Sequence, residues 1–275
     1  MRNLIGVMQG RLLPKYKGRY QAHPVNYWQD EFFIAKSLEL DCIEFILDFN
    51  DVEKNPLMSS YGIKEINSLI KQTDVSVNSI CADYFMEKPL HSINDKEANQ
   101  SFATLEYLIE IASELNLKDI VIPCVDQSSL ADSKSFNRFI DRVSKIIPLI
   151  ESNNVNLSLE TDLAPLPFAQ LLTQLNSKNI TVNYDIGNSA AQGYDPIDEL
   201  TTYGSKISDI HIKDRVFSGG PVLLGEGDAN FFAFFNKIKE FDYKGPFIMQ
   251  AYRDDEGLRV FKKQLAWIKA YFDIL

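Results

Sequence analysis

The chain has 275 residues, of which 45% are hydrophobic and 24% charged, and its formal net charge is −10 at pH 7. This share of apolar residues is enough for one large core, so the composition excludes a wholly disordered chain. The excess of acidic over basic residues argues against nonspecific binding to a nucleic-acid backbone, and no apolar run is long enough to span a membrane. The chain has three cysteines, too few and too widely spaced for a disulfide framework or for the spacing typical of metal ligands. We therefore expect a cytoplasmic protein.

Short apolar runs rich in β-branched residues recur along the chain, and each is predicted to be a strand. The runs lie at 4–9, 42–47, 75–81, 119–125, 155–160, 180–185, 207–213 and 246–251. Their spacing of roughly 25–45 residues leaves room for one helix and two loops between consecutive strands.

Apolar residues at helical spacing fill the gaps between these runs. The predicted helices lie at 27–40, 92–115, 136–150, 168–175, 231–241 and 258–272. Strands that alternate with helices in a chain of this length fit a closed (β/α)8 TIM barrel better than an open sheet. The turn after the first strand also lacks the Gly-rich fingerprint of dinucleotide-binding folds. We therefore predict an α/β protein with a single TIM-barrel domain over residues 1–275.

Polar residues alternate with apolar ones along the fifth, sixth and seventh predicted strands. Packing against helices requires apolar side chains, so the polar set should face the barrel interior. Glu160, Asp185 and His211 end these strands, and Gln250 holds the equivalent position on the eighth. Barrel enzymes place their chemistry at this end of the strands. Two carboxylates, an imidazole and an amide oxygen suit one divalent cation such as Mn²⁺, Mg²⁺, Co²⁺ or Zn²⁺, and a hydrogen-bonded ion cluster is the alternative.

Four short segments around these positions are similar to motifs of a known family. They are LSLET at 157–161, YDIGNSA at 184–190, HIKDR at 211–215 and LGEGD at 224–228. Together they resemble the xylose isomerase-like TIM barrel superfamily, a group of sugar and sugar-phosphate isomerases and epimerases related to a DNA-repair endonuclease branch.

The resemblance implies one divalent metal ion held by Glu160, Asp185, His211 and the strand-eight residue. In the epimerase branch this last ligand is typically a glutamate, and the two glutamates act as acid–base groups on opposite faces of the substrate. The residue here is Gln250, whose amide can coordinate a metal but cannot take a proton from carbon. We therefore predict a metal-dependent sugar or sugar-phosphate isomerase or epimerase that works through an enediolate, with Glu160 as the base.

Substrate-binding residues are expected on the same rim. The cations Lys213, Arg215 and Arg253 would repel a metal ion unless an anion lies between them and the metal. The phosphate of a substrate could be this anion. Glu44, on the second strand, either contacts the substrate or forms a buried hydrogen bond. The loop after the first strand is long enough to cover the mouth of the barrel.

Other functions stay open on the sequence. Epimerisation needs a second acid, which Lys213, Asp214 or Glu226 could supply from a loop. A non-catalytic sugar-binding relative, or a metal-dependent lyase or dehydratase, would use the same barrel. A DNA-repair phosphodiesterase is disfavoured, because its multinuclear site needs many histidines and this chain has three. The expected partner is a small sugar or sugar phosphate, with no nucleic acid or membrane, and a homo-oligomer is possible through an exposed aromatic edge.

Overall fold

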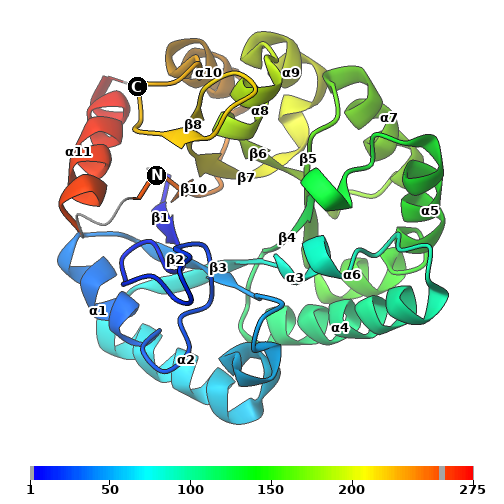
Figure 1. Cartoon of the computed structure of the whole chain (residues 1–275), viewed down its shortest axis with the longest axis horizontal. Helices are drawn as coiled ribbons and strands as arrows, with labels where there is room; N and C mark the ends of the chain where they lie inside the picture. Colours follow the sequence, from blue (N-terminus) through cyan, green and yellow to red (C-terminus); the bar gives the residue numbers. More distant parts are fainter. Residues whose placement is uncertain (1–2, 254–257, 275) are drawn as a thin grey trace.

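The computed structural model describes residues 3–253 and 258–274, and the side chains of 3–253 and 258–272. Eight parallel strands close into a barrel in the order β1-β10-β7-β6-β5-β4-β3-β2, with helices around it (Figure 1). The barrel strands are β1 (Ile5–Met8), β2 (Cys42–Ile46), β3 (Ser76–Cys81), β4 (Asp119–Cys124), β5 (Asn156–Thr161), β6 (Ile180–Asp185), β7 (Ile207–Ile212) and β10 (Phe247–Met249). This closed order is the predicted (β/α)8 TIM barrel.

The longer helices cover the outside of the barrel, and shorter ones lie in the connections. The helices are α1 (Asp30–Ser37), α2 (Ser60–Thr73), α3 (Tyr84–Glu87), α4 (Asp95–Glu114), α5 (Ser133–Val143), α6 (Ile147–Asn153), α7 (Pro165–Leu175), α8 (Ile186–Gln192), α9 (Pro196–Tyr203), α10 (Phe231–Ile238) and α11 (Leu258–Ile274). Five 3-10 turns lie at Val52–Lys54, Pro56–Met58, Asp126–Ser128, Gly204–Lys206 and Lys239–Phe241, and a two-stranded hairpin joins β8 (Asp214–Arg215) to β9 (Pro221–Val222). Over 3–253 and 258–274, none of these helices has the length and apolar character that crossing a bilayer requires.

The predicted strands are confirmed, and each ends within a residue or two of its expected position. The helix predicted at 136–150 is instead two helices, α5 and α6, and α6 begins around a proline. Pro148 lacks an N–H and disfavours helical backbone in the residue before it, so one continuous helix is broken there. Helix α2 was not predicted, and its first turn contains Gly62, a poor helix former that lies against the backbone of Pro56.

Two layers of buried side chains hold the barrel. The larger one packs the outward faces of the strands against the helices and includes Leu157 and Leu159. Their neighbour Ser158 faces the other way, with its Oγ 3.1 Å from Oγ of Ser208. The smaller apolar cluster consists of Met8, Cys42, Ile46, Cys81, Val121 and Ile248, on the strands β1, β2, β3, β4 and β10. Polar side chains of β5, β6 and β7 therefore lie in the interior, where Glu44 of β2 and Ser79 of β3 also lie.

The loop after β1 is tied down by a buried carboxylate. Glu31, in the first turn of α1, accepts hydrogen bonds from the backbone N–H groups of Gly10 (2.8 Å) and Leu12 (3.0 Å). Gly10 has a φ of +87°, and a Cβ there would lie 2.1 Å from the carbonyl oxygen of Tyr20, so the turn requires glycine. This anchoring brings Arg11 and Gln21 to the mouth of the barrel, where both line a cavity.

The buried imidazole of His23 should make the stability of the fold depend on pH. Its Nδ1 lies 3.1 Å from Oε1 of Gln9, its Nε2 has no hydrogen-bond partner, and burial lowers its pKa to about 4. The unfolded chain takes up this proton below about pH 6.5, whereas the folded chain resists it until about pH 4. His23 by itself should therefore lower the free energy of unfolding by about 1.4 kcal/mol per pH unit as the pH drops through this window, while buried carboxyls with a raised pKa, such as Glu31, act in the opposite direction.

Urea unfolding at pH 7 and pH 5 measures this effect. The variant His23→Asn keeps a donor near the Nδ1 position but does not titrate, so its loss of stability between the two pH values should be smaller by about 2 kcal/mol. The same pH dependence in both proteins would contradict the assignment to His23.

Candidate active site

Three side chains from adjacent strands converge at the carboxyl end of the barrel. Glu160 comes from β5, Asp185 ends β6 and His211 lies on β7, where it pairs in register with Asp185. All three are buried, and their candidate ligand atoms lie within 4.8 Å of one another. The structure thus brings together the three residues that the sequence placed at strand ends.

Asn188, in the first turn of α8, orients the two carboxylates. Its backbone N–H donates to Oδ1 of Asp185 (2.8 Å), which caps the helix, and its side-chain amide donates to Oε1 of Glu160 (2.5 Å). The amide oxygen of Asn188 accepts from Nζ of Lys213 (3.1 Å) and from Nη1 of Arg215 (2.8 Å). Lys213 also donates to Oδ2 of Asp185 at 3.1 Å. One amide therefore joins the carboxylates to two cationic side chains.

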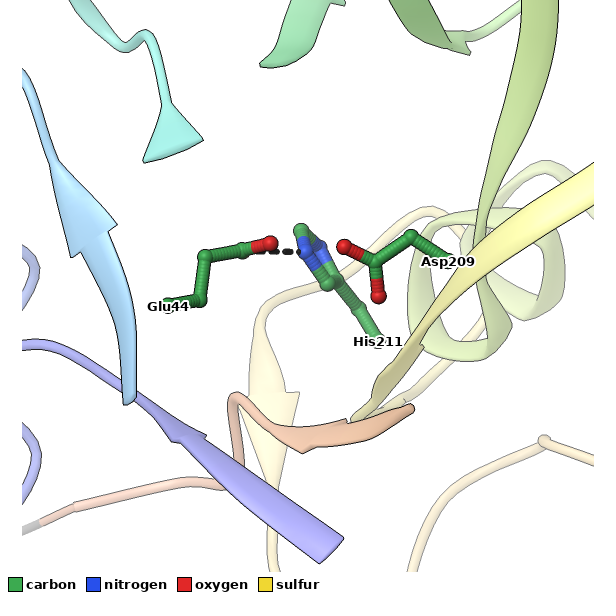
Figure 2. Close-up of side chains that lie close together, drawn as sticks. All are labelled: Glu44, Asp209 and His211. Carbon is green, nitrogen blue, oxygen red and sulfur yellow. Dashed lines mark hydrogen bonds and ion pairs between the residues drawn. The ribbon is translucent and has the colours of Figure 1, made fainter. Parts of the chain in front are cut away.

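Glu44 lies behind the imidazole of His211 (Figure 2). Its Oε1 is 2.7 Å from Nε2 of His211, and its Oε2 accepts a hydrogen bond of 2.6 Å from Oγ of Ser79. Because a carboxylate accepts from Nε2–H, the lone pair of the ring is on Nδ1. That Nδ1 is buried without a hydrogen-bond partner and lies 3.9 Å from Oδ2 of Asp185. The imidazole thus presents its free nitrogen to the other two residues of the cluster.

Asp209 completes the arrangement behind the imidazole. Its Oδ1 accepts from the backbone N–H of Ile210 (2.8 Å), while its Oδ2 receives no donor. Burial, together with the nearby charge of Glu44, raises the pKa of Asp209 well above its ordinary value, which favours the protonated form of this carboxyl beside Glu44. Glu44 has no exposed surface, so of the two roles considered for it the structure favours the buried hydrogen bond.

Gln250 lies directly after β10 and is buried beside the cluster. Its amide nitrogen donates to Oε1 of Gln21 at 3.0 Å, while its amide oxygen has no hydrogen-bond partner. Two buried, unpartnered acceptors, this oxygen and Nδ1 of His211, therefore accompany the carboxylates of Glu160 and Asp185. Such groups are costly to bury unless something binds them. Nδ1 of His211 and the two carboxylates, with ligand atoms within 4.8 Å of one another, form a donor set that fits a divalent cation.

The local charge also favours a cation. Burial raises the pKa of Glu160, and the negative charge of Asp185 raises it further, while His211 and Lys213 act in the opposite direction. Two carboxylates this close together are stable in their charged forms only where positive charge compensates for them.

A basic cavity of about 230 Å³ opens beside the cluster. It is lined by Arg11, Gln21, Lys213, Arg215, Pro221, Gln250, Tyr252 and Arg253. Burial, together with the charge of Arg253, lowers the pKa of Arg11 to about 10. Arg253 stacks over the ring of Tyr20 at 4.6 Å and donates to the backbone carbonyl of Arg11. Lys213, Arg215 and Arg253 therefore share one rim, and the loop after β1 adds Arg11 as a fourth cation.

Asp214, one of the acids considered for proton transfer, has a structural role instead. It is fully buried, and its carboxylate accepts hydrogen bonds from the backbone N–H groups of Gly225 (2.9 Å), Gly227 (3.0 Å) and Ala229 (3.1 Å). These contacts engage both of its oxygens in shaping the loop after β9.

The model of the xylose isomerase-like TIM barrel family matches residues 32–271. The chain belongs to this family. It is 26% identical to the putative L-ribulose-5-phosphate 3-epimerase SgbU of Haemophilus influenzae over 263 residues, 88% of this chain and 90% of that protein. It is 25% identical to the L-ribulose-5-phosphate 3-epimerase UlaE of Escherichia coli strain K12 / DH10B over 259 residues, 88% and 89% of the two chains. The crystal structure of the IolI protein with a zinc atom superposes with a TM-score of 0.76 at 14% identity and covers 98% of each chain. The family member described here is an enzyme of the isomerase and epimerase class.

Proposed function

We propose that the protein is a metal-dependent sugar-phosphate epimerase. The observation that carries the proposal is the cluster of Glu160, Asp185 and His211, with the free Nδ1 of the imidazole facing two carboxylates. The zinc in the IolI structure and the sugar-phosphate substrates in the names of SgbU and UlaE support the same function. A bound divalent cation would polarise the carbonyl of a ketose and stabilise the enediolate formed from it.

Glu160 is the base that removes the proton from the carbon next to the carbonyl. Its raised pKa brings the carboxylate closer to the basicity that proton abstraction at neutral pH requires. The hydrogen bond from Asn188 engages Oε1 and leaves Oε2 to receive the proton. Asp185, His211 and Gln250 would hold the cation with Glu160.

The basic cavity binds the phosphate of the substrate. Arg11 and Arg253 each have a buried Nε without a hydrogen-bond partner, and their like charges repel. A phosphate between them would supply acceptors for both guanidinium groups and remove this repulsion. Lys213 and Arg215 line the same cavity. The phosphate would therefore bind next to the proposed metal site.

Metal removal and restoration test this function directly. The protein is treated with a chelator, reloaded with Mn²⁺, Mg²⁺, Co²⁺ or Zn²⁺, and incubated in D₂O with L-ribulose 5-phosphate or with L-ribulose. We expect deuterium incorporation and epimer formation only with metal, and a lower KM for the phosphorylated sugar. Turnover that is unchanged after metal removal, or that is faster with the unphosphorylated sugar, would contradict the proposal.

Arg253→Gln should raise KM for the phosphorylated substrate by about 10- to 100-fold, because it removes a charged hydrogen-bond donor worth about 1.5–3 kcal/mol. KM for the unphosphorylated sugar should change little. Arg19→Gln is a matched control, because Arg19 pairs with Asp48 and does not line the basic cavity. Equal KM effects on both sugars would show that Arg253 does not bind phosphate.

A further inference from the structure

Inversion of a carbon centre requires two proton-transfer groups. The proton leaves one face of the carbon, and a proton has to return to the other face, which the base on the first side does not reach. Glu160 serves one face. Gln250, at the end of β10, is an amide without an acidic proton near neutral pH. If the protein is an epimerase, as proposed above, the mouth has to contain another acid.

The loop acids considered from the sequence do not meet this need. Asp214 is fully buried and anchors the loop after β9, so its carboxylate is not accessible from the mouth. Lys213 donates to Asp185 and Asn188, so its ammonium group is held on the metal side of the cluster. Glu226 is solvent-exposed on the loop after β9, whereas the cluster is buried.

A further carboxyl group at this end of the barrel is that of Asp83, which follows a strand two places from β5 in the barrel order. Asp83 follows β3 and is partly accessible to solvent, unlike Glu44 and Asp209 beneath the cluster. Its Oδ2 accepts from the amide nitrogen of Gln21 (3.1 Å), and its Oδ1 accepts from Sγ of Cys81 (3.2 Å). The carboxyl is therefore held in place by two donors.

A hydrogen-bonded chain links Asp83 to the residue at the end of β10. Oε1 of Gln21 accepts from the amide nitrogen of Gln250 (3.0 Å) and from Nη2 of Arg11 (3.0 Å). Gln21 therefore bridges the ends of β10 and β3, with its oxygen toward Gln250 and its amide nitrogen toward Asp83. A glutamate at position 250 could not donate to this oxygen, so the neutral side chain of Gln250 holds Gln21 in the orientation that supports Asp83.

Asp83 also interacts with a cation of the basic cavity. Burial lowers the pKa of Arg11, and Asp83 is the strongest of the charges that oppose this effect. Burial raises the pKa of Asp83 itself, which favours a form that can donate a proton.

We propose that Asp83 is the second acid–base group of the reaction and takes the place of a carboxylate at the end of β10. The carboxylate of Glu160 takes the proton as the C–H bond breaks, and the electron pair of that bond enters the enediolate. The Asp83 carboxyl then gives its proton to the other face of the same carbon, so a new C–H bond forms and Asp83 becomes a carboxylate. Exchange of protons with water returns both groups to their starting states, and no oxidant or reductant is needed.

The two half-reactions can be measured separately with L-ribulose 5-phosphate in D₂O and the metal-loaded protein. Asp83→Asn keeps an acceptor for Gln21 but has no acidic proton. We expect this variant to exchange the carbon proton of the recovered substrate within about tenfold of the wild-type rate, through Glu160, while formation of the epimer falls by at least about 100-fold.

A second variant moves the carboxylate back to the strand. Adding Gln250→Glu to Asp83→Asn should restore part of the epimer formation, which a merely structural role of Asp83 would not allow. Asp162→Asn is the matched control, because Asp162 is another partly exposed carboxyl after a barrel strand. It accepts a hydrogen bond from Ser129 and is not part of the hydrogen-bonded chain through Gln21. Its ratio of exchange to conversion should equal that of the wild type.

The outcomes separate the two proposals. Two results would overturn the role of Asp83 and leave the epimerase proposal standing. One is epimer formation at the wild-type rate in Asp83→Asn. The other is a parallel loss of exchange and conversion that Gln250→Glu does not restore. A wild-type protein that neither exchanges nor converts the sugar phosphate with any of the four metals would overturn the proposed function and the role of Asp83 with it.

Discussion

Glu160→Gln should abolish exchange of the substrate's carbon proton and leave the barrel folded. The glutamine has nearly the same size and still offers an oxygen to the amide of Asn188, so the packing at the end of β5 is kept. It has no carboxylate to receive a proton, and a positioned general base contributes about 10²–10⁴-fold to such a step. Proton NMR of L-ribulose 5-phosphate in D₂O measures the exchange rate, and urea unfolding checks the fold.

Loss of metal could produce the same result, so the comparison needs Asp185→Asn. Both variants remove one negative ligand from the proposed metal site, but only Glu160→Gln removes the proposed base. At saturating metal we expect Asp185→Asn to recover much of its exchange and Glu160→Gln to recover none. Recovery in both variants would make Glu160 a metal ligand only, and wild-type exchange in Glu160→Gln without added metal would remove it from the mechanism.

The barrel could be predicted because its strands carry a local signal. Runs such as Ile180–Asp185 are rich in β-branched residues, and the alternation along β5, β6 and β7 separates the side chains facing the helices from those facing the interior. Parallel strands bring their carboxyl ends to one face, so Glu160, Asp185 and His211 could be expected to meet without knowledge of any contact. The cluster could therefore be predicted although its residues are widely separated in the sequence.

The roles of the loop residues could not be predicted in this way. Arg11, Gln21 and Asp83 lie in connections without periodicity, and their positions depend on backbone anchors such as Glu31. Glu44 and His211 are 167 residues apart and come from strands that are not neighbours in the sheet, so only closure of the barrel brings them into contact. A polar residue on a strand predicts burial in the interior, but its partner is set by the curvature of the whole sheet.

Glu44→Gln should weaken divalent-metal binding by about 10- to 100-fold, although Glu44 is not itself expected to touch the metal. The carboxylate accepts from Nε2–H of His211 and so keeps the lone pair on Nδ1, which faces Glu160 and Asp185. Its negative charge also makes the imidazole a stronger ligand, and removal of such a partner typically costs this much affinity. Calorimetric titration of the metal-free protein with Zn²⁺ or Mn²⁺ measures the loss.

Ser79→Ala separates this effect from a general disturbance behind the imidazole. It removes the other hydrogen bond to Glu44 but leaves the carboxylate and its charge against the ring, so its loss of metal affinity should be no more than about fivefold. Nitrogen NMR of the histidines should show Nε2 protonated in the wild type and in Ser79→Ala, and a mixture of tautomers in Glu44→Gln. If Glu44→Gln leaves both the tautomer of His211 and the metal affinity unchanged, the prediction is wrong. The carboxylate would then neither fix the position of the ring proton nor strengthen the ligand by its charge, and packing alone would orient this imidazole.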